Sequence, residues 1–87
     1  MPYVYLLRCA DNSLYTGQAE NLEARLARHN MGTASAFTAR RRPVRLVYSE
    51  ALPTPALALA RERQLKRWTR AKKEALIAGD LIALKRL

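Results

Sequence analysis

The chain has 87 residues, with 16 Lys and Arg against 7 Asp and Glu, for a formal net charge of +9. This length suffices for one domain with a modest core, and we take residues 1–87 as that domain. The hydrophobic fraction of 49% argues against disorder, and no apolar run reaches the ~18 residues of a membrane span. The positive charge predicts a polyanionic partner, with nucleic acid favoured over a membrane surface.

The N-terminal residues and the cysteine content predict a cellular location. Residues 1–5 show no charged stretch ahead of their apolar side chains, and Cys9 is the single cysteine. A lone cysteine forms no intramolecular disulfide and no zinc site, so we expect Cys9 to be a small buried hydrophobe. We therefore expect a cytoplasmic protein, and we expect it to be a monomer.

The first two predicted elements form a β-hairpin. Residues 3–9 and 13–18 are rich in strand formers, and a turn signal at Asp11 and Asn12 separates them. A two-residue loop would put Tyr5 and Tyr15 on opposite faces, whereas a three-residue loop over residues 10–12 would put them on one face. Asn12 accepts the left-handed conformation that the longer loop needs, which favours a shared tyrosine face.

A helix follows the hairpin. Asn21 is a good N-cap, and residues 30–32 are predicted to end the helix. Four side chains then recur at helical spacing on one face, namely Leu22, Arg25, Leu26 and His29. An arginine and a histidine on an inward face need polar partners, because an unpaired buried polar group lowers stability.

Residues 33–42 are predicted to form an ordered loop, and a third strand follows Pro43 with Val44, Leu46 and Tyr48 in alternation. The loop ends in three arginines, Arg40, Arg41 and Arg42. In a chain of this charge we predict that this loop contacts phosphates, although a merely solvated loop is the simpler alternative.

The C-terminal part is predicted to be helical. Thr54 and Pro55 begin a helix that runs to about Arg67, and Thr69 caps a further helix that Gly79 ends, with residues 81–87 as a short amphipathic tail. One apolar stripe of the first of these helices contains Leu57, Ala58, Leu65 and Trp68, with Glu62 at its edge and Lys66 a turn further on.

A second basic cluster surrounds Trp68 and includes Lys66 and Arg70. We interpret Trp68 as a packing residue rather than a base-stacking platform, and its basic neighbours as candidates for backbone contacts. The whole order of elements is β-β-α-β-α-α, an α+β fold in which helices cover a small sheet.

In this arrangement the chain resembles the GIY-YIG nuclease superfamily, most closely its small stand-alone bacterial members. Tyr3, Val4 and Thr16 depart from the usual glycine and isoleucines of the two signature segments, which are scaffold positions. The segments that carry the resemblance are residues 3–5, 15–17, 21–26, 28–30, 42–48 and 60–66.

The resemblance implies a three-stranded antiparallel sheet and a Mg²⁺-dependent (or Mn²⁺-dependent) endonuclease that hydrolyses DNA phosphodiesters. DNA is then favoured over RNA as the partner, and DNA repair or the processing of structured DNA is a possible setting. Glu62 is the implied metal ligand, Arg25 the phosphate contact, and a tyrosine the general base. The implied catalytic residues are Tyr5, Tyr15, Arg25, His29 and Glu62.

Physical chemistry is compatible with these roles and leaves alternatives open. A phosphodiester transition state needs a bidentate donor such as Arg25 and a hard cation on an oxygen ligand such as Glu62. A tyrosine of pKa ~10 is a poor base at neutral pH, so Tyr5 needs nearby cationic groups or a hydrogen bond to His29 to lower its pKa or relay its proton. Tyr15 could equally orient the water or hydrogen-bond the scissile phosphate. A binding module without catalysis on the same scaffold, and a role on RNA, are the alternative functions.

Overall fold

The computed structural model describes residues 1–86, and the last residue of the predicted tail, Leu87, lies outside the described residues. Its three strands are β1 (Tyr3–Arg8), β2 (Leu14–Ala19) and β3 (Arg45–Ala51), and they form one antiparallel sheet in the order β2-β1-β3. Its helices are α1 (Leu22–Met31), α2 (Ala36–Ala39), α3 (Pro55–Lys66), α4 (Arg70–Ala78) and α5 (Leu81–Arg86). The α+β class and the antiparallel three-stranded sheet are thereby confirmed.

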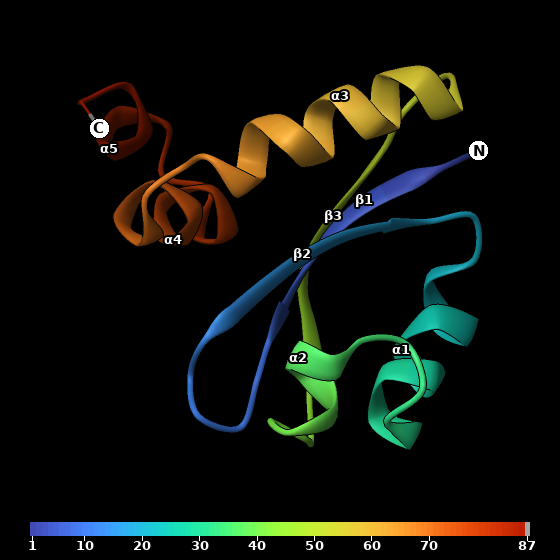
Figure 1. Ribbon diagram of the computed structural model, residues 1–87. Coiled ribbons are helices and arrows are strands. Elements are labelled where there is room, and N and C mark those ends of the chain that lie inside the picture. The colour runs from blue at the N-terminus through green and yellow to red at the C-terminus, as the bar shows by residue number, and fades with distance from the viewer. Residues whose placement is uncertain (87) are drawn as a thin grey trace.

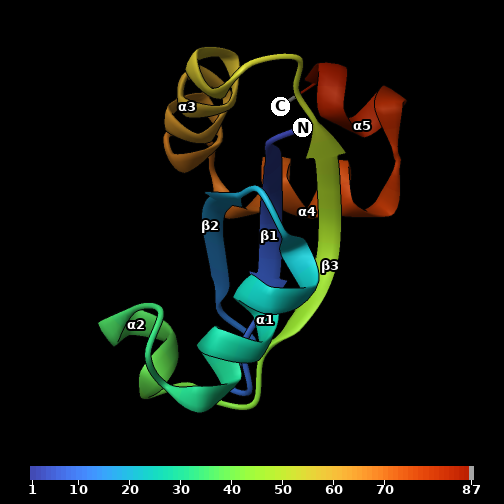
Figure 2. The same ribbon diagram turned by 90° about the vertical axis from the view of Figure 1, so that its right-hand side faces the viewer.

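The sheet separates two groups of helices. Figure 1 shows α1 and α2 on one side of the strands and α3, α4 and α5 on the other. Successive side chains of β1 point to opposite faces of the sheet and contribute to both hydrophobic cores. Tyr5 and Leu7 pack toward α1, whereas Val4 packs against Ala58 and Leu65 of α3. In Figure 2, α1 lies in front of the sheet and α4 behind it, while α2 and α3 both lie toward the β2 edge.

The hairpin register confirms the shared tyrosine face. Tyr5 pairs with Gly17 and Leu7 pairs with Tyr15, so the two tyrosines project to the same side of the sheet. The backbone N–H of Cys9 donates to the carbonyl oxygen of Ser13 at 2.9 Å, which closes a three-residue loop. Asn12 takes the left-handed conformation predicted for it, with φ of 70°.

Two expectations are wrong. Residues 33–42 are not all loop, because Ser35 accepts a hydrogen bond from the backbone N–H of Thr38 and begins the short helix α2. A helix of four residues has no periodic pattern to detect. Leu57 is not part of the buried stripe and is 49% exposed, because α3 turns Ala58 toward the sheet and adjacent helical residues point about 100° apart.

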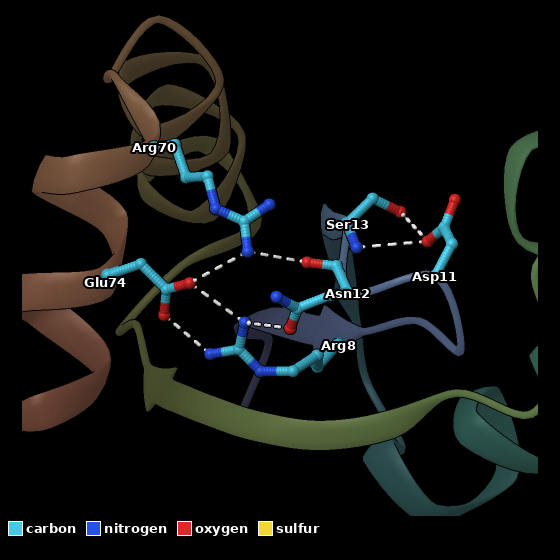
Figure 3. Close-up of polar contacts among 6 residues, drawn as sticks. All are labelled: Arg8, Asp11, Asn12, Ser13, Arg70 and Glu74. Carbon is cyan, nitrogen blue, oxygen red and sulfur yellow. Dashed lines mark hydrogen bonds and ion pairs between the residues drawn. The ribbon is translucent and has the colours of Figure 1, made fainter.

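A polar clamp joins α4 to the hairpin (Figure 3). Arg8 of β1 donates two hydrogen bonds to the carboxylate of Glu74, at 2.9 and 2.5 Å. Arg70 donates to the same carboxylate at 3.2 Å and to the carbonyl oxygen of Asn12 at 2.7 Å. The clamp ties the C-terminal helices to the hairpin loop, where Ser13 donates to Asp11 from its backbone N–H at 3.0 Å.

The predicted helix boundaries are confirmed by their caps. Asn21, Thr54 and Thr69 each accept a hydrogen bond from a backbone N–H in the first turn of their helix. Gly32 and Gly79 end α1 and α4 in the left-handed conformation that glycine adopts without strain. Within residues 1–86, no helix is both long and apolar enough to cross a membrane.

Candidate active site

The predicted catalytic side chains meet at the outer edge of β2. The ring of Tyr5 reaches across its pairing partner Gly17, and a Cβ at Gly17 would lie 2.5 Å from Tyr5 Oη and 3.1 Å from the Tyr15 ring. The backbone of Gly17 has no positive φ, so glycine is needed there for space rather than for conformation. The glycine two residues after Tyr15 therefore leaves room for the Tyr5 hydroxyl of β1 to lie over β2.

His29 of α1 is buried beside this hydroxyl, and both of its ring nitrogens have partners. Nε2 lies 2.8 Å from Tyr5 Oη, and Nδ1 lies 2.7 Å from Thr38 Oγ1. The hydroxyl hydrogen of Thr38 has two acceptors on Ser35, the carbonyl oxygen at 3.4 Å and Oγ at 3.3 Å, so we assign the ring N–H to Nδ1, with Thr38 Oγ1 as its acceptor. Nε2 then accepts a hydrogen bond from the hydroxyl of Tyr5.

The ionisation of this group follows from its burial. Burial, followed by the charges of Arg25 and Arg28, lowers the pKa of His29 below its usual value, so the imidazole is neutral at pH 7. Burial and then the neighbouring Tyr15 raise the pKa of Tyr5 to about 12. The Tyr15 ring packs edge-on against His29, with centroids 5.0 Å apart. We call Tyr5, Tyr15, His29 and Thr38 the imidazole cluster.

Two charged residues reach the same edge from opposite layers. Arg25 of α1 donates to the carbonyl oxygen of Gln18 at 3.2 Å, an acceptor available because β2 is an edge strand. The Gln18 side chain donates to Glu62 Oε1 of α3 at 3.0 Å, and Lys66 Nζ lies 2.9 Å from Glu62 Oε2. We call Gln18, Glu62 and Lys66 the carboxylate corner.

The donor set at this edge suits a hard divalent cation held in part by substrate. Among residues 1–86, no three His, Cys, Asp or Glu side chains gather into a ready-made metal cage. Mg²⁺ commonly takes one or two carboxylates and completes its shell with water and phosphate oxygens. Glu62 can supply that carboxylate, since 13% of its side chain is exposed and its ion-pair partner Lys66 is itself 53% exposed.

The predicted nucleic-acid contacts come from both sides of the sheet, and two of them, Arg41 and Arg70, reach the hairpin loop at Asp11 and Asn12. Residues 40–42 follow α2, which lies with α1 on one side of the sheet, whereas Lys66 ends α3 and Arg70 begins α4, both on the other side (Figure 1). Arg41 is paired with Asp11, and Arg42 donates to the carbonyl oxygen of Ala39 at 2.9 Å. The remaining member, Arg40, caps α2 and is exposed. The interpretation of Trp68 as a packing residue fits its position against the Val4, Ala58 and Leu65 cluster.

Two residues at the site were not identified from the sequence. Thr38 fixes the orientation of His29, and Gln18 connects Glu62 with β2. The spacing of Ser35 and Thr38 contains an N-cap signal that could have pointed to α2. Nothing local marks Gln18, because its role depends on the approach of α3 to the β2 edge.

A pocket lies apart from this edge. It has a volume of about 530 Å³ and lies between the hairpin loop and the start of β3, with Arg8, Cys9, Val44 and Arg45 among its lining residues. None of the five predicted catalytic residues lines it. The candidate site is instead an open strand edge, which suits a polymeric substrate better than an enclosed small molecule.

Comparison with known proteins places the chain in a family. Residues 1–75 match the family model described as the GIY-YIG catalytic domain. The chain belongs to the GIY-YIG family. A UPF0213 protein of Natronomonas pharaonis is 45% identical over 78 residues, covering 90% of this chain and 92% of that protein. A UPF0213 protein of Staphylococcus aureus (strain Mu3) is 48% identical over 75 residues, covering 86% and 92%.

A solved GIY-YIG relative has the same fold. The solution NMR structure of a UPF0213 protein of Bacillus halodurans matches with a TM-score of 0.59 and 37% identity, covering 92% of this chain and 86% of that one. The resemblance expected from the sequence is thereby confirmed, and with it a nuclease-type fold. GIY-YIG nucleases generally use a divalent metal ion.

Proposed function

We propose that this GIY-YIG protein is a metal-dependent endonuclease that hydrolyses DNA phosphodiester bonds at the β2 edge. The observation that carries the proposal is that one strand edge gathers three features. The Tyr5 hydroxyl is hydrogen-bonded to a neutral histidine, the Arg25 guanidinium contacts the Gln18 carbonyl oxygen, and the Glu62 carboxylate contacts the Gln18 side chain. Such groups supply proton transfer, charge neutralisation and a metal ligand for phosphoryl transfer.

The proton path starts at the attacking water. Because the pKa of Tyr5 is raised to about 12, the phenolate is not the resting form and Tyr5 is a weak base by itself. Tyr5 Oη takes the proton of the water as its own hydroxyl proton passes to His29 Nε2, 2.8 Å away. The resulting imidazolium keeps its Nδ1 hydrogen bond to Thr38.

Charge develops on the phosphate as the oxygen of the water bonds to phosphorus and the bond to the leaving oxygen breaks. Arg25 supplies planar donors for the non-bridging oxygens once it exchanges the Gln18 carbonyl for the substrate. Glu62 would hold Mg²⁺ or Mn²⁺, which when bound acts as a Lewis acid on the phosphate and the leaving oxygen. Tyr15 keeps the His29 ring in place by edge-on packing.

Nicking of supercoiled plasmid tests the proposal. We would compare the wild type, Glu62→Gln and Tyr5→Phe with Mg²⁺ or with EDTA, and measure DNA binding in parallel at fixed salt. Glu23→Gln makes the same change of charge on the exposed face of α1 and is the matched control. We expect metal-dependent nicking by wild type and Glu23→Gln, and loss of nicking with retained binding in the other two variants.

A second candidate is a nucleic-acid-binding module that does not cleave. The ion pair between Lys66 and Glu62 favours it, because a neutralised carboxylate removes a local repulsion of phosphate. Retarded but uncut plasmid with wild type, together with intact branched DNA and RNA, would support this module and refute the endonuclease. Competition between DNA and RNA at matched salt decides the partner.

A further inference from the structure

Helix α2 carries an aromatic side chain outward beside the candidate site. Thr38 is fully buried on His29, whereas its neighbour Phe37 is 38% exposed and belongs to neither core cluster. The Phe37 ring lies 6.0 Å from the Tyr15 ring, and the Tyr15 ring lies 5.0 Å from His29. A row of rings therefore runs from the buried histidine to the surface.

A guanidinium covers one face of this exposed ring. The Cζ atom of Arg41 lies 3.8 Å from the centroid of Phe37. Arg41 also donates to the Phe37 carbonyl oxygen at 2.9 Å and to Asp11 Oδ2 at 3.1 Å. These hydrogen bonds hold the guanidinium over the Phe37 ring, and 33% of the Arg41 side chain remains exposed.

We propose that Phe37 and Arg41 form a stacking subsite for an unpaired nucleobase adjacent to the phosphate bound at the β2 edge. The inference deepens the proposed function and rests on it for the position of that phosphate. Nucleobases stack on aromatic rings and on guanidinium planes without regard to sequence. A base inside a duplex has both faces covered by its neighbours, so only an unpaired base can use this surface.

The placement of α2 makes the subsite rigid. Thr38 anchors the helix in the interior, and Ser35 caps its first turn, so Phe37 cannot move far without disturbing His29. Pre-organised side chains lose less entropy on binding. The substrate class that follows is DNA with unpaired nucleotides, such as a single strand, a flap or a frayed end, in preference to a continuous duplex.

Binding to 2-aminopurine oligonucleotides tests the subsite without cleavage. The protein carries Glu62→Gln and the buffer contains EDTA, and the fluorescence of a single-stranded probe is compared with that of the same probe in a duplex. We expect a stacking-dependent fluorescence change and tighter binding with the single strand. Phe37→Leu should weaken single-strand binding by about 5- to 150-fold and leave duplex binding unchanged.

Three further variants separate stacking from charge and from folding. Phe37→Tyr should keep the binding of the single strand, whereas Arg41→Lys should weaken it while keeping the net charge. Leu46→Ala removes a β3 side chain that is also 38% exposed, and it should have no effect. Equal losses on single strand and duplex, or no loss in Phe37→Leu, would overturn the subsite.

The outcomes remain distinct from those of the endonuclease test. Selective binding of unpaired bases by a protein that cuts no substrate would keep the subsite and refute the endonuclease. Metal-dependent cutting that is indifferent to Phe37→Leu and to unpaired bases would refute the subsite and keep the endonuclease.

Discussion

On the α1 side of the β2 edge, the polar atoms of Tyr5, His29 and Thr38 are buried and paired with one another. On the α3 side, Glu62 keeps part of its side chain in solvent and shares its carboxylate with Gln18 and Lys66. Tyr5, His29 and Thr38 of the imidazole cluster are therefore closed off from solvent by the fold, whereas the carboxylate corner is open to solvent. A site that moves a proton and recruits a cation benefits from both properties.

Gly17→Ala would break the imidazole cluster most severely. Its Cβ would lie 2.5 Å from Tyr5 Oη and 2.6 Å from Tyr5 Cζ, so the hydroxyl must leave His29. We expect cleavage to fall by about 100-fold or more, the contribution of a positioned acid or base. Nicking rates measure the loss, and circular dichroism checks that the protein is folded.

Thr16→Val is the matched control for that variant, because Thr16 lies on the same strand but faces away from Tyr5. The Oγ1 atom of Thr16 is buried without a hydrogen-bond partner in the described part of the chain. The control should keep full cleavage and be at least as stable as wild type. Equal loss in both variants would show that β2 is merely intolerant of change.

Thr38→Val tests how the cluster orients its histidine. The substitution keeps the shape of the side chain and leaves Nδ1 of His29 buried without an acceptor. We expect the free energy of unfolding to fall by about 1–3 kcal/mol, the cost of an unsatisfied buried donor. Urea denaturation measures it, and Thr38→Ser, which keeps the hydroxyl, should recover most of the loss. An unchanged stability in Thr38→Val would refute the assigned tautomer.

Acid should weaken the imidazole cluster before it affects the carboxylates. The pKa of His29 is lowered in the folded state, so as the pH falls the histidine of the unfolded chain binds a proton before that of the folded chain. The free energy of unfolding therefore decreases as the pH falls through about 6.5. The pKa of Glu74 is also lowered, chiefly by hydrogen bonds from Arg8, but it acts only at more acidic pH. Urea denaturation between pH 7.5 and about 5 should show the decline, and His29→Gln should abolish it. His29 is the single histidine, so a decline that persists in the variant would refute this assignment.

Lys66→Met tests the carboxylate corner and has the smallest expected effect of these variants. Lys66 Nζ and a divalent cation compete for the carboxylate of Glu62, so its removal should lower the Mg²⁺ concentration for half-maximal cleavage by a few fold. Lys66 is more than half exposed, so stability should hardly change. Arg67→Met removes an adjacent exposed charge and controls for weaker DNA attraction. A higher Mg²⁺ requirement in Lys66→Met would contradict the competition.

Local signals in the sequence determined the elements and their boundaries. The caps at Asn21 and Thr54, the stop at Gly32 and the left-handed Asn12 each act within a few residues, where backbone hydrogen bonds and sterics decide the outcome. The hairpin register followed from Asn12, and with it the shared face of the two tyrosines. The family, and through it the candidate residues, followed from the order of the signature segments, of which residues 3–5 and 15–17 are the first two.

The tertiary structure alone decided how the site is assembled. No local pattern marks Gln18 or Phe37, and the N-cap signal at Ser35 indicates α2 without indicating that Thr38 contacts His29. Each of the three acts on a residue brought near by the packing of helices on the sheet. Lys66 and Arg70 differ in this respect, because each pairs with a glutamate four residues away on its own helix, whereas the pair of Arg8 with Glu74 joins β1 to α4. Caps and turns are read from neighbours in sequence, whereas partners across a sheet edge exist only after long-range packing has placed them.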